Sequence, residues 1–231
     1  SIFSTTVCWR KKGLIILTTS AVLFTKLNLN VKNIILTGTA ILVGVLIAVF
    51  GQIYQTGANA YDFFLGWTLF ISLWVVISNF PPLWLVFLAL VNTTFVLYSQ
   101  QVASYWSEVF IFSILFVFNS LVLVFTHLLL RFRQDIKVPS WFTSIIGLVA
   151  IASSTIGIII GIFDEHQSSF LLLLLLSILA YGVGLFYSIK TKSGFYLSII
   201  PFSIIIIISA LLIKISEEAA MFFIVSLFII V

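Results

Sequence analysis

Long apolar runs separated by short polar gaps set the pattern of this chain. The clear runs cover residues 33–54, 62–79, 80–100, 108–130, 141–163, 168–189 and 193–213. Each is close to the ~20 residues that a helix needs to cross ~30 Å of hydrocarbon. The runs do not alternate between polar and apolar residues as the strands of a membrane β-barrel do, so helices are expected. The pattern therefore predicts seven membrane-spanning helices.

Two further apolar runs, one near each end, extend this prediction. The run 13–31 contains Lys26, whose aliphatic stem must reach the headgroups if the run is to span. Residues 219–231 are apolar throughout but shorter than a crossing. Because this run stops short and the first residue is Ser1, we expect the sequence to be a fragment of a longer chain. The predicted fold is an all-α polytopic transmembrane helix bundle of eight to nine spans, the last truncated, in a single domain over residues 1–231.

The amino-acid composition identifies lipid as the surroundings of these runs. Hydrophobic residues make up 62% of the 231-residue chain and charged residues 8%, whereas soluble domains have about 45–50% apolar and about 25% charged residues. A soluble chain of this length could not bury so much apolar surface. The expected partner of the chain is therefore the lipid bilayer. Its net charge of +4 is interpreted as a feature of membrane topology, and no nucleic acid is expected as a partner.

With 13–31 counted as a span, three of the connections that fall on one side of the membrane contain lysine or arginine, and three connections on the other side contain none. Basic residues occur in the gaps 26–32, 131–137 and 190–192, and none occurs in the gaps 52–62, 100–108 and 164–169. Short cytoplasmic loops of membrane proteins are enriched in these residues. The basic side is therefore predicted to be cytoplasmic. Arg10, Lys11 and Lys12 conflict with this orientation if 13–31 is a span, and agree with it if that run lies in the interface.

The gap with the most polar chemistry lies between the runs 33–54 and 62–79. Its candidate ligand-binding residues are Gln52, Tyr54, Gly57, Asn59, Asp62 and Trp67. One interpretation is structural: the aromatic residues belong to an interfacial belt, and Asn59 with Asp62 caps the next helix. The other is functional: a polar loop lines the mouth of a cavity and binds a cation or a hydrogen-bonding solute. Both interpretations stay open at this stage.

The same gap carries a resemblance to a known family. The matching positions are Gln52, Ile53, Tyr54, Gln55, Gly57, Asp62, Leu65 and Trp67. This pattern resembles the signature of a bacterial family of predicted multi-span membrane proteins, domain of unknown function 2157. The resemblance is concentrated in residues 51–67. It implies a multi-pass protein of the bacterial cytoplasmic (inner) membrane, and it implies no chemistry because the family has no established activity.

Other residues point to helix packing. Asn92 and Asn119 lie inside spans, where an amide can hydrogen-bond to a neighbouring helix. Gly157 and Gly161 have the spacing of a Gly-xxx-Gly motif, which allows two helices to approach closely. We expect these four residues to serve packing.

The sequence contains no pattern typical of catalysis or metal binding. It has no nucleophile elbow, no zinc-protease motif and no phosphate-binding glycine loop with lysine. Asp164, Glu165 and His166 are adjacent on a tight loop and point in different directions, so a solvated turn is favoured over a metal site. Cys8 is the only cysteine. We therefore predict no catalytic residue, no metal site and no cofactor.

Three functional hypotheses follow. The first is a structural or accessory membrane subunit that contacts other membrane proteins or forms a homo-oligomer, because the spans are apolar on all faces. The second is a passive channel or small-solute transporter with the loop Gln52 to Asp62 as its vestibule. The third is a membrane enzyme whose catalytic part lies outside this stretch. Carboxylates occur only at span ends, which disfavours ion-coupled transport.

Overall fold

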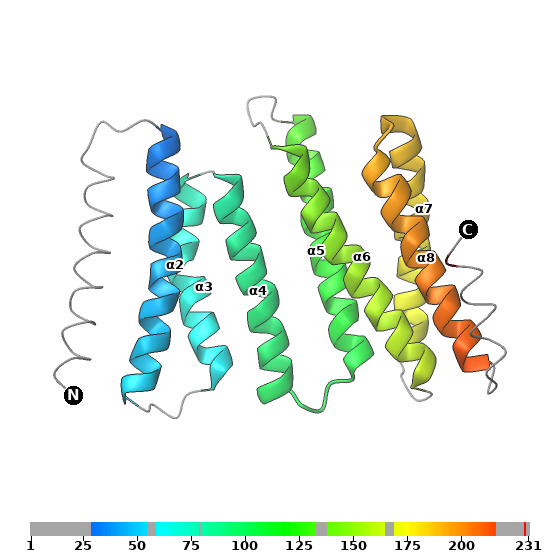
Figure 1. Cartoon of the computed structure of the whole chain (residues 1–231), viewed down its shortest axis with the longest axis horizontal. Helices are drawn as coiled ribbons and strands as arrows, with labels where there is room; N and C mark the ends of the chain where they lie inside the picture. The colour runs from blue at the N-terminus through cyan, green and yellow to red at the C-terminus, as the bar shows by residue number, and fades with distance from the viewer. Residues whose placement is uncertain are drawn as a thin grey trace. The chain divides into compact units, whose positions relative to one another are not determined.

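The computed structural model describes residues 29–54, 59–78, 80–132, 138–164, 169–215 and 229. These residues form seven long helices and no strand (Figure 1). Each helix is long and apolar enough to cross a membrane. The predicted all-α transmembrane class is therefore confirmed, and the seven clear runs correspond to the seven helices. Apart from residues 29–31 and 229, the predicted end spans 13–31 and 219–231 lie outside the described residues.

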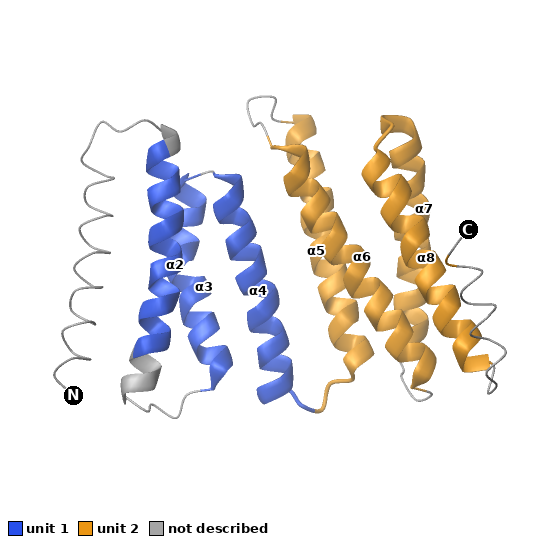
Figure 2. Cartoon of the chain, in the orientation of Figure 1, with its two compact units in different colours: residues 1–104 blue, residues 105–231 orange. Residues whose placement is uncertain are grey.

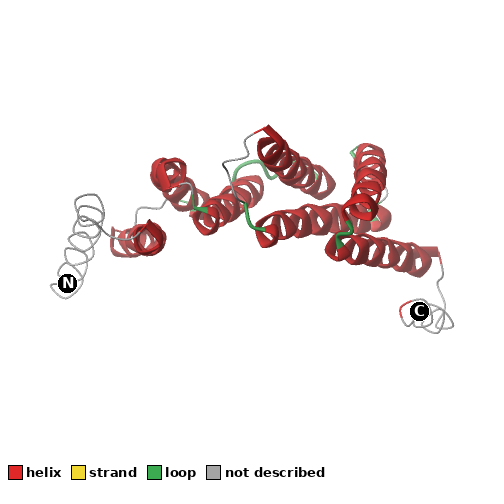
Figure 3. Cartoon of the chain, turned by 90° about the horizontal axis from the view of Figure 1, so that it is seen from above, coloured by secondary structure: helices red, strands yellow, loops and turns green. Residues whose placement is uncertain are grey.

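The contacts among helices divide the chain into two compact units, residues 1–104 and 105–231 (Figure 2). The first unit contains α2 (Leu29–Tyr54), α3 (Ala60–Ser78) and α4 (Pro81–Gln101). The second contains α5 (Glu108–Phe132), α6 (Ser140–Phe163), α7 (Phe170–Thr191) and α8 (Gly194–Ile215). Figure 3, a view from above, shows only helices and loops in the described part of both units.

The helix ends follow from local sequence. Pro81 occupies the first turn of α4, where its missing N–H is not needed and its fixed φ suits a helix. Pro139 stands in extended conformation just before α6. Lys192 ends α7 in the left-handed region, with φ of 53°, and this conformation reverses the chain into α8 within a few residues. Because helices begin and end at these residues, their lengths stay close to that of one membrane crossing.

In the first unit, α3 contacts both α2 and α4. The buried core consists of small and branched side chains surrounded by partly buried aromatic rings. Its buried members are Ala40, Ile71, Val75, Leu83 and Leu90. The rings packed against them include Trp67, Trp74 and Trp84.

In the second unit, α6 is the central helix and contacts α5, α7 and α8. The buried share of its span is 61%, whereas no other described span exceeds 33%. The core around α6 includes Val109, Phe116, Ala150, Ile158 and Leu173. Since α6 is covered on most sides, it is the helix on which small and hydroxyl side chains have the largest effect on packing.

Candidate functional site

The start of α3 is closed by a reciprocal cap between Asn59 and Asp62. The Asn59 N–H donates to the Asp62 carboxylate Oδ2 at 3.0 Å, and the Asp62 N–H donates to the Asn59 carbonyl at 3.1 Å. The first of these bonds is one half of a capping box, in which a side chain at the third helical position reaches back to the residue before the helix. The carboxylate also lies at the positive end of the helix dipole. Both residues are exposed, so the carboxylate stays accessible from the polar side.

The same end of α3 is connected to the end of α4. The Tyr61 N–H donates to Oε1 of Gln101 at 3.1 Å, and the rings of Tyr61 and Tyr98 meet edge to face with centroids 5.5 Å apart. Sequence analysis did not identify Tyr98 or Gln101, which lie about forty positions away. From the sequence, their proximity could be expected only because α3 and α4 are adjacent spans of similar length. Such spans pair in antiparallel fashion, which places the end of α4 beside the start of α3.

Trp67 lies further along α3 and connects it to α2. Its indole Nε1–H donates to the Ala40 carbonyl oxygen at 2.8 Å. The ring occupies the space next to Gly44, where any added Cβ atom would collide with it. A glycine on α2 therefore creates the space that the indole fills, and the interaction joins two helices inside the span.

The structure describes three of the six predicted ligand-binding side chains, those of Asn59, Asp62 and Trp67. Asn59 and Asp62 are brought together at the cap, while Trp67 points into the α2–α3 contact. Gln52 and Tyr54 belong to the last turn of α2, and their side chains lie outside the described part of the chain. Gly57 also lies outside the described residues. Ligand binding by this set stays a prediction.

Five hydroxyl residues of α6, α7 and α8 form two hydrogen-bonded groups inside the second unit, and together we call them the hydroxyl cluster: Ser154 with Ser177, and Thr155 with Tyr181 and Ser203. Ser203 Oγ lies 2.6 Å from Thr155 Oγ1 and 2.8 Å from the Tyr181 hydroxyl. Ser154 Oγ lies 2.6 Å from Ser177 Oγ. All five residues are buried. The cluster therefore joins three helices through hydrogen bonds in the interior of the unit.

Sequence analysis did not single out Thr155, Tyr181 or Ser203 as site residues. A weak signal existed in the spacing of Ser177 and Tyr181, which are four residues apart and therefore on one face of α7. That signal cannot identify partners on other helices.

The predicted packing residues show two kinds of contact. A Cβ atom at Gly157 would lie 2.7 Å from Leu173 Cδ2 and 2.9 Å from Phe112 Cβ, and one at Gly161 would collide with the Phe170 ring. These close approaches are those expected of a Gly-xxx-Gly motif. The amides of Asn92 and Asn119 donate to carbonyl oxygens one turn back in their own helices, at 2.7 Å and 2.8 Å. The packing role of the four residues stays a prediction.

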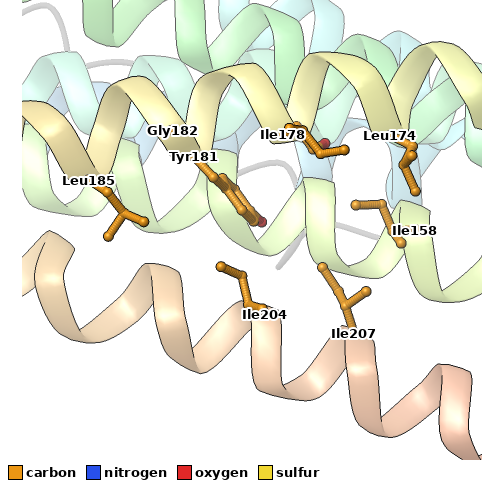
Figure 4. A pocket seen from close by; sticks show the side chains of 9 residues that line it. Ile158, Leu174, Ile178, Tyr181, Gly182, Leu185, Ile204 and Ile207 are labelled. Atoms are coloured by element: carbon orange, nitrogen blue, oxygen red, sulfur yellow. The ribbon is translucent and has the colours of Figure 1, made fainter.

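An apolar groove of about 330 Å³ lies beside the hydroxyl cluster. Figure 4 shows Leu174, Ile178, Tyr181 and Leu185 along α7, with Ile204 and Ile207 of α8 pointing toward them. The hydroxyls of Tyr181 and Ser177 are hydrogen-bonded within the unit. The groove therefore presents mainly hydrocarbon to any occupant.

The charged groups that the structure describes lie at helix ends. Within the described ranges, the buried polar residues are serine, threonine and asparagine, all neutral. Asp62, Glu108 and Asp164 are exposed. Among the described residues no three His, Cys, Asp or Glu side chains group together as metal ligands would. Glu165, His166 and Cys8 lie outside the described residues.

Seven span-length apolar helices define a multi-pass membrane protein. Within that class, the chain is similar over residues 8–84 to a family described as predicted membrane protein, DUF2157. This match confirms the predicted resemblance and extends it well beyond residues 51–67, across α2, α3 and the start of α4. No curated protein and no solved structure matches the chain.

Proposed function

We propose that this chain is a structural or accessory subunit of a membrane assembly. The observation that carries the proposal is the chemistry of the buried polar groups. Those that the structure describes are all neutral, and the hydroxyls of the cluster bond to one another or to helix carbonyls. Ser209 Oγ is the single buried side-chain polar atom without a partner in the described part of the chain. Hydroxyl groups that bond to one another join helices. Few of them remain available to bind a polar solute.

Ion or proton coupling normally places ionisable residues inside the bilayer. The exposed positions of Asp62, Glu108 and Asp164 at helix ends therefore support a role without coupled transport. The outer faces of the helices carry many exposed apolar side chains, such as Leu73, Val76 and Phe186. Lipid covers such faces, and another membrane protein or a second copy of the chain can replace it.

The proposed setting is the bacterial cytoplasmic membrane, with the basic end of the second unit inside the cell. Arg131, Lys190 and Lys192 lie at one end of α5 and α7, and Glu108 and Asp164 lie at the opposite end. One described basic residue, Lys214 in the last turn of α8, lies at the same end as Glu108 and Asp164. The family match and the positive-inside rule support this orientation.

Reconstituted flux tests the proposal. The full chain is placed in liposomes that contain separate reporters for protons, potassium and a small uncharged solute. We expect the same leak as in protein-free liposomes, with a pore-forming peptide as the positive control. Flux that rises in proportion to the amount of protein would contradict the accessory role.

A passive channel with its vestibule at Gln52 to Asp62 is the second candidate. The observation in its favour is the exposed Asp62 carboxylate beside Tyr61 and the end of α4. Asp62→Asn removes the charge but keeps an oxygen that can accept the Asn59 N–H. Any cation flux of the wild-type chain that falls severalfold in this variant supports the channel, and unchanged flux in a stably folded variant rules out this vestibule.

A further inference from the structure

We propose that the groove between α7 and α8 holds one acyl chain of an anionic phospholipid, whose phosphate is bound at Lys192. The groove is the described cavity bounded by Leu174, Ile178, Tyr181 and Leu185 on one helix and by Ile204 and Ile207 on the other. The proposal goes beyond the accessory role and does not depend on it.

The chemistry of the lining fits a hydrocarbon chain. The two lining hydroxyl residues, Ser177 and Tyr181, already have hydrogen-bond partners inside the hydroxyl cluster. The remaining lining side chains are aliphatic, apart from Gly182. A polar ligand would lose its hydrogen bonds to water here and gain none, whereas a hydrocarbon chain loses nothing. An unfilled groove would also deprive its walls of dispersion contacts.

The position of the groove fits a bilayer lipid as the source of that chain. The groove is continuous with a lipid-facing surface, since Ile178 is 62% exposed and its neighbours Leu175 and Leu179 are 58% and 67% exposed. From Leu174 to Leu185 it extends for about 16 Å, at ~1.5 Å per helical residue. The groove lies across the middle of α7, so a chain that enters from the Lys192 end reaches past the midplane of the ~30 Å hydrocarbon core.

Charge complementarity identifies the headgroup. Leu174, Ile178, Tyr181 and Leu185 follow one another at spacings of four, three and four, and Lys192 comes seven residues after Leu185. The four groove residues therefore lie on one stripe of the helix, and Lys192, which follows the last helical residue Thr191, stands at the polar end of α7 about two turns beyond the groove. Lys192 is exposed at the left-handed end of α7, about 10 Å along the axis from Leu185. A phosphate at Lys192 therefore leaves room for the glycerol backbone before the chain enters the groove.

Two substitutions separate the chain-binding part from the headgroup-binding part. Gly182 lines the groove and a Cβ atom there would meet nothing within 4 Å, so Gly182→Phe is the substitution chosen to fill the groove. Gly66 on α3 has the same free surroundings, and Gly66→Phe is the matched control. Lys192→Gln removes the proposed phosphate contact. Lys32→Gln, in the first turn of α2, is its control.

The experiment is native mass spectrometry of the full chain with an equimolar mixture of phosphatidylglycerol and phosphatidylcholine that carry identical acyl chains. We expect one bound lipid per wild-type chain, with phosphatidylglycerol preferred about fivefold, the contribution of one lysine near a membrane surface. Gly182→Phe reduces retention of both lipids at least tenfold. Lys192→Gln removes the preference but retains phosphatidylcholine at the wild-type level. Both controls behave as the wild type.

Three results would overturn the proposal. The first is wild-type lipid retention by a folded Gly182→Phe variant. The second is an unchanged preference for phosphatidylglycerol in Lys192→Gln, which stays informative even if the glycine variant fails to fold. The third is a lipid-free dimer that Gly182→Phe converts to monomers, because that result assigns the groove to a second copy of the chain.

Discussion

Both units pack a ring over a glycine, but they differ in how far hydroxyl groups connect their helices. In the first unit, the Trp67 indole fills the space at Gly44 and bonds to a backbone carbonyl of the adjacent helix, and one hydroxyl pair, Thr68 with Thr94 at 3.3 Å, connects α3 to α4. In the second, the Tyr196 ring fills the space at Gly147 and bonds to a backbone carbonyl, and a buried hydroxyl cluster connects three helices around α6. Lipid tails are as apolar as leucine, so burial of hydrocarbon alone hardly drives helix association in a membrane. The comparison shows two solutions to that problem, shape around an aromatic ring and hydrogen bonds among small side chains.

The largest effect is expected from Trp67→Ala. The substitution removes both the ring that fills the space at Gly44 and the hydrogen bond to Ala40. We expect the free energy of unfolding to fall by about 3 kcal/mol, the low end for aromatic truncations, because the ring is only partly buried. Hydrogen exchange of the full chain in micelles should locate the loss in α2 and α3. Trp141→Ala, at a 43% exposed position of the second unit, is the control, and equal losses in the two variants would contradict the account of Trp67.

Gly157→Val tests the packing of α6. The new side chain would overlap Leu173, which is fully buried, and the Cβ atom of Phe112. Overpacking of this kind costs about 1–3 kcal/mol, and faster hydrogen exchange should be confined to the second unit. Gly182→Val places the same side chain where no atom lies within 4 Å. A destabilisation by the Gly182 variant as large as that by the Gly157 variant would show that the valine itself, and not the close approach, is responsible.

Tyr181→Phe sharpens the comparison because it removes one hydroxyl and keeps the ring. Ser203 retains its contact with Thr155 at 2.6 Å. The expected loss is therefore small, about 0.6–1.7 kcal/mol, the range measured for hydrogen bonds between membrane helices. Denaturant titration in mixed micelles measures it, with Tyr105→Phe at an 82% exposed position as the control. A gain in stability would mean that the cluster serves a purpose other than packing.

The smallest effect is expected at the α3 cap. Asp62→Ala removes the acceptor of the Asn59 N–H and should cost about 0.5–1 kcal/mol. Asp62→Asn keeps an acceptor and should cost less than half as much. Thermal unfolding of the two variants side by side gives the comparison, and a larger loss in the Asn variant would show that the charge, rather than the cap, is what the position requires.

The sequence predicted the helices better than the contacts between them. Hydropathy located all seven described spans because each apolar run has the length of one crossing. The cap at Asn59 and Asp62 was also predictable, since it depends on residues three positions apart. The Trp67–Ala40 contact and the hydroxyl cluster were not predictable. Spans that are apolar on every side show no amphipathic stripe that would identify the buried face.

The proposed accessory role depends most on one claim, that the buried hydroxyls of the second unit join helices in a dry interior. Hydroxyl-radical footprinting of the full chain in lipid nanodiscs tests it most directly, because radicals label only side chains that water reaches. Tyr181 is 7% exposed and Tyr105 is 82% exposed. We predict rapid labelling of Tyr105 and none above background at Tyr181. Labelling of the two tyrosines at similar rates would reveal a water path through the second unit and contradict the claim.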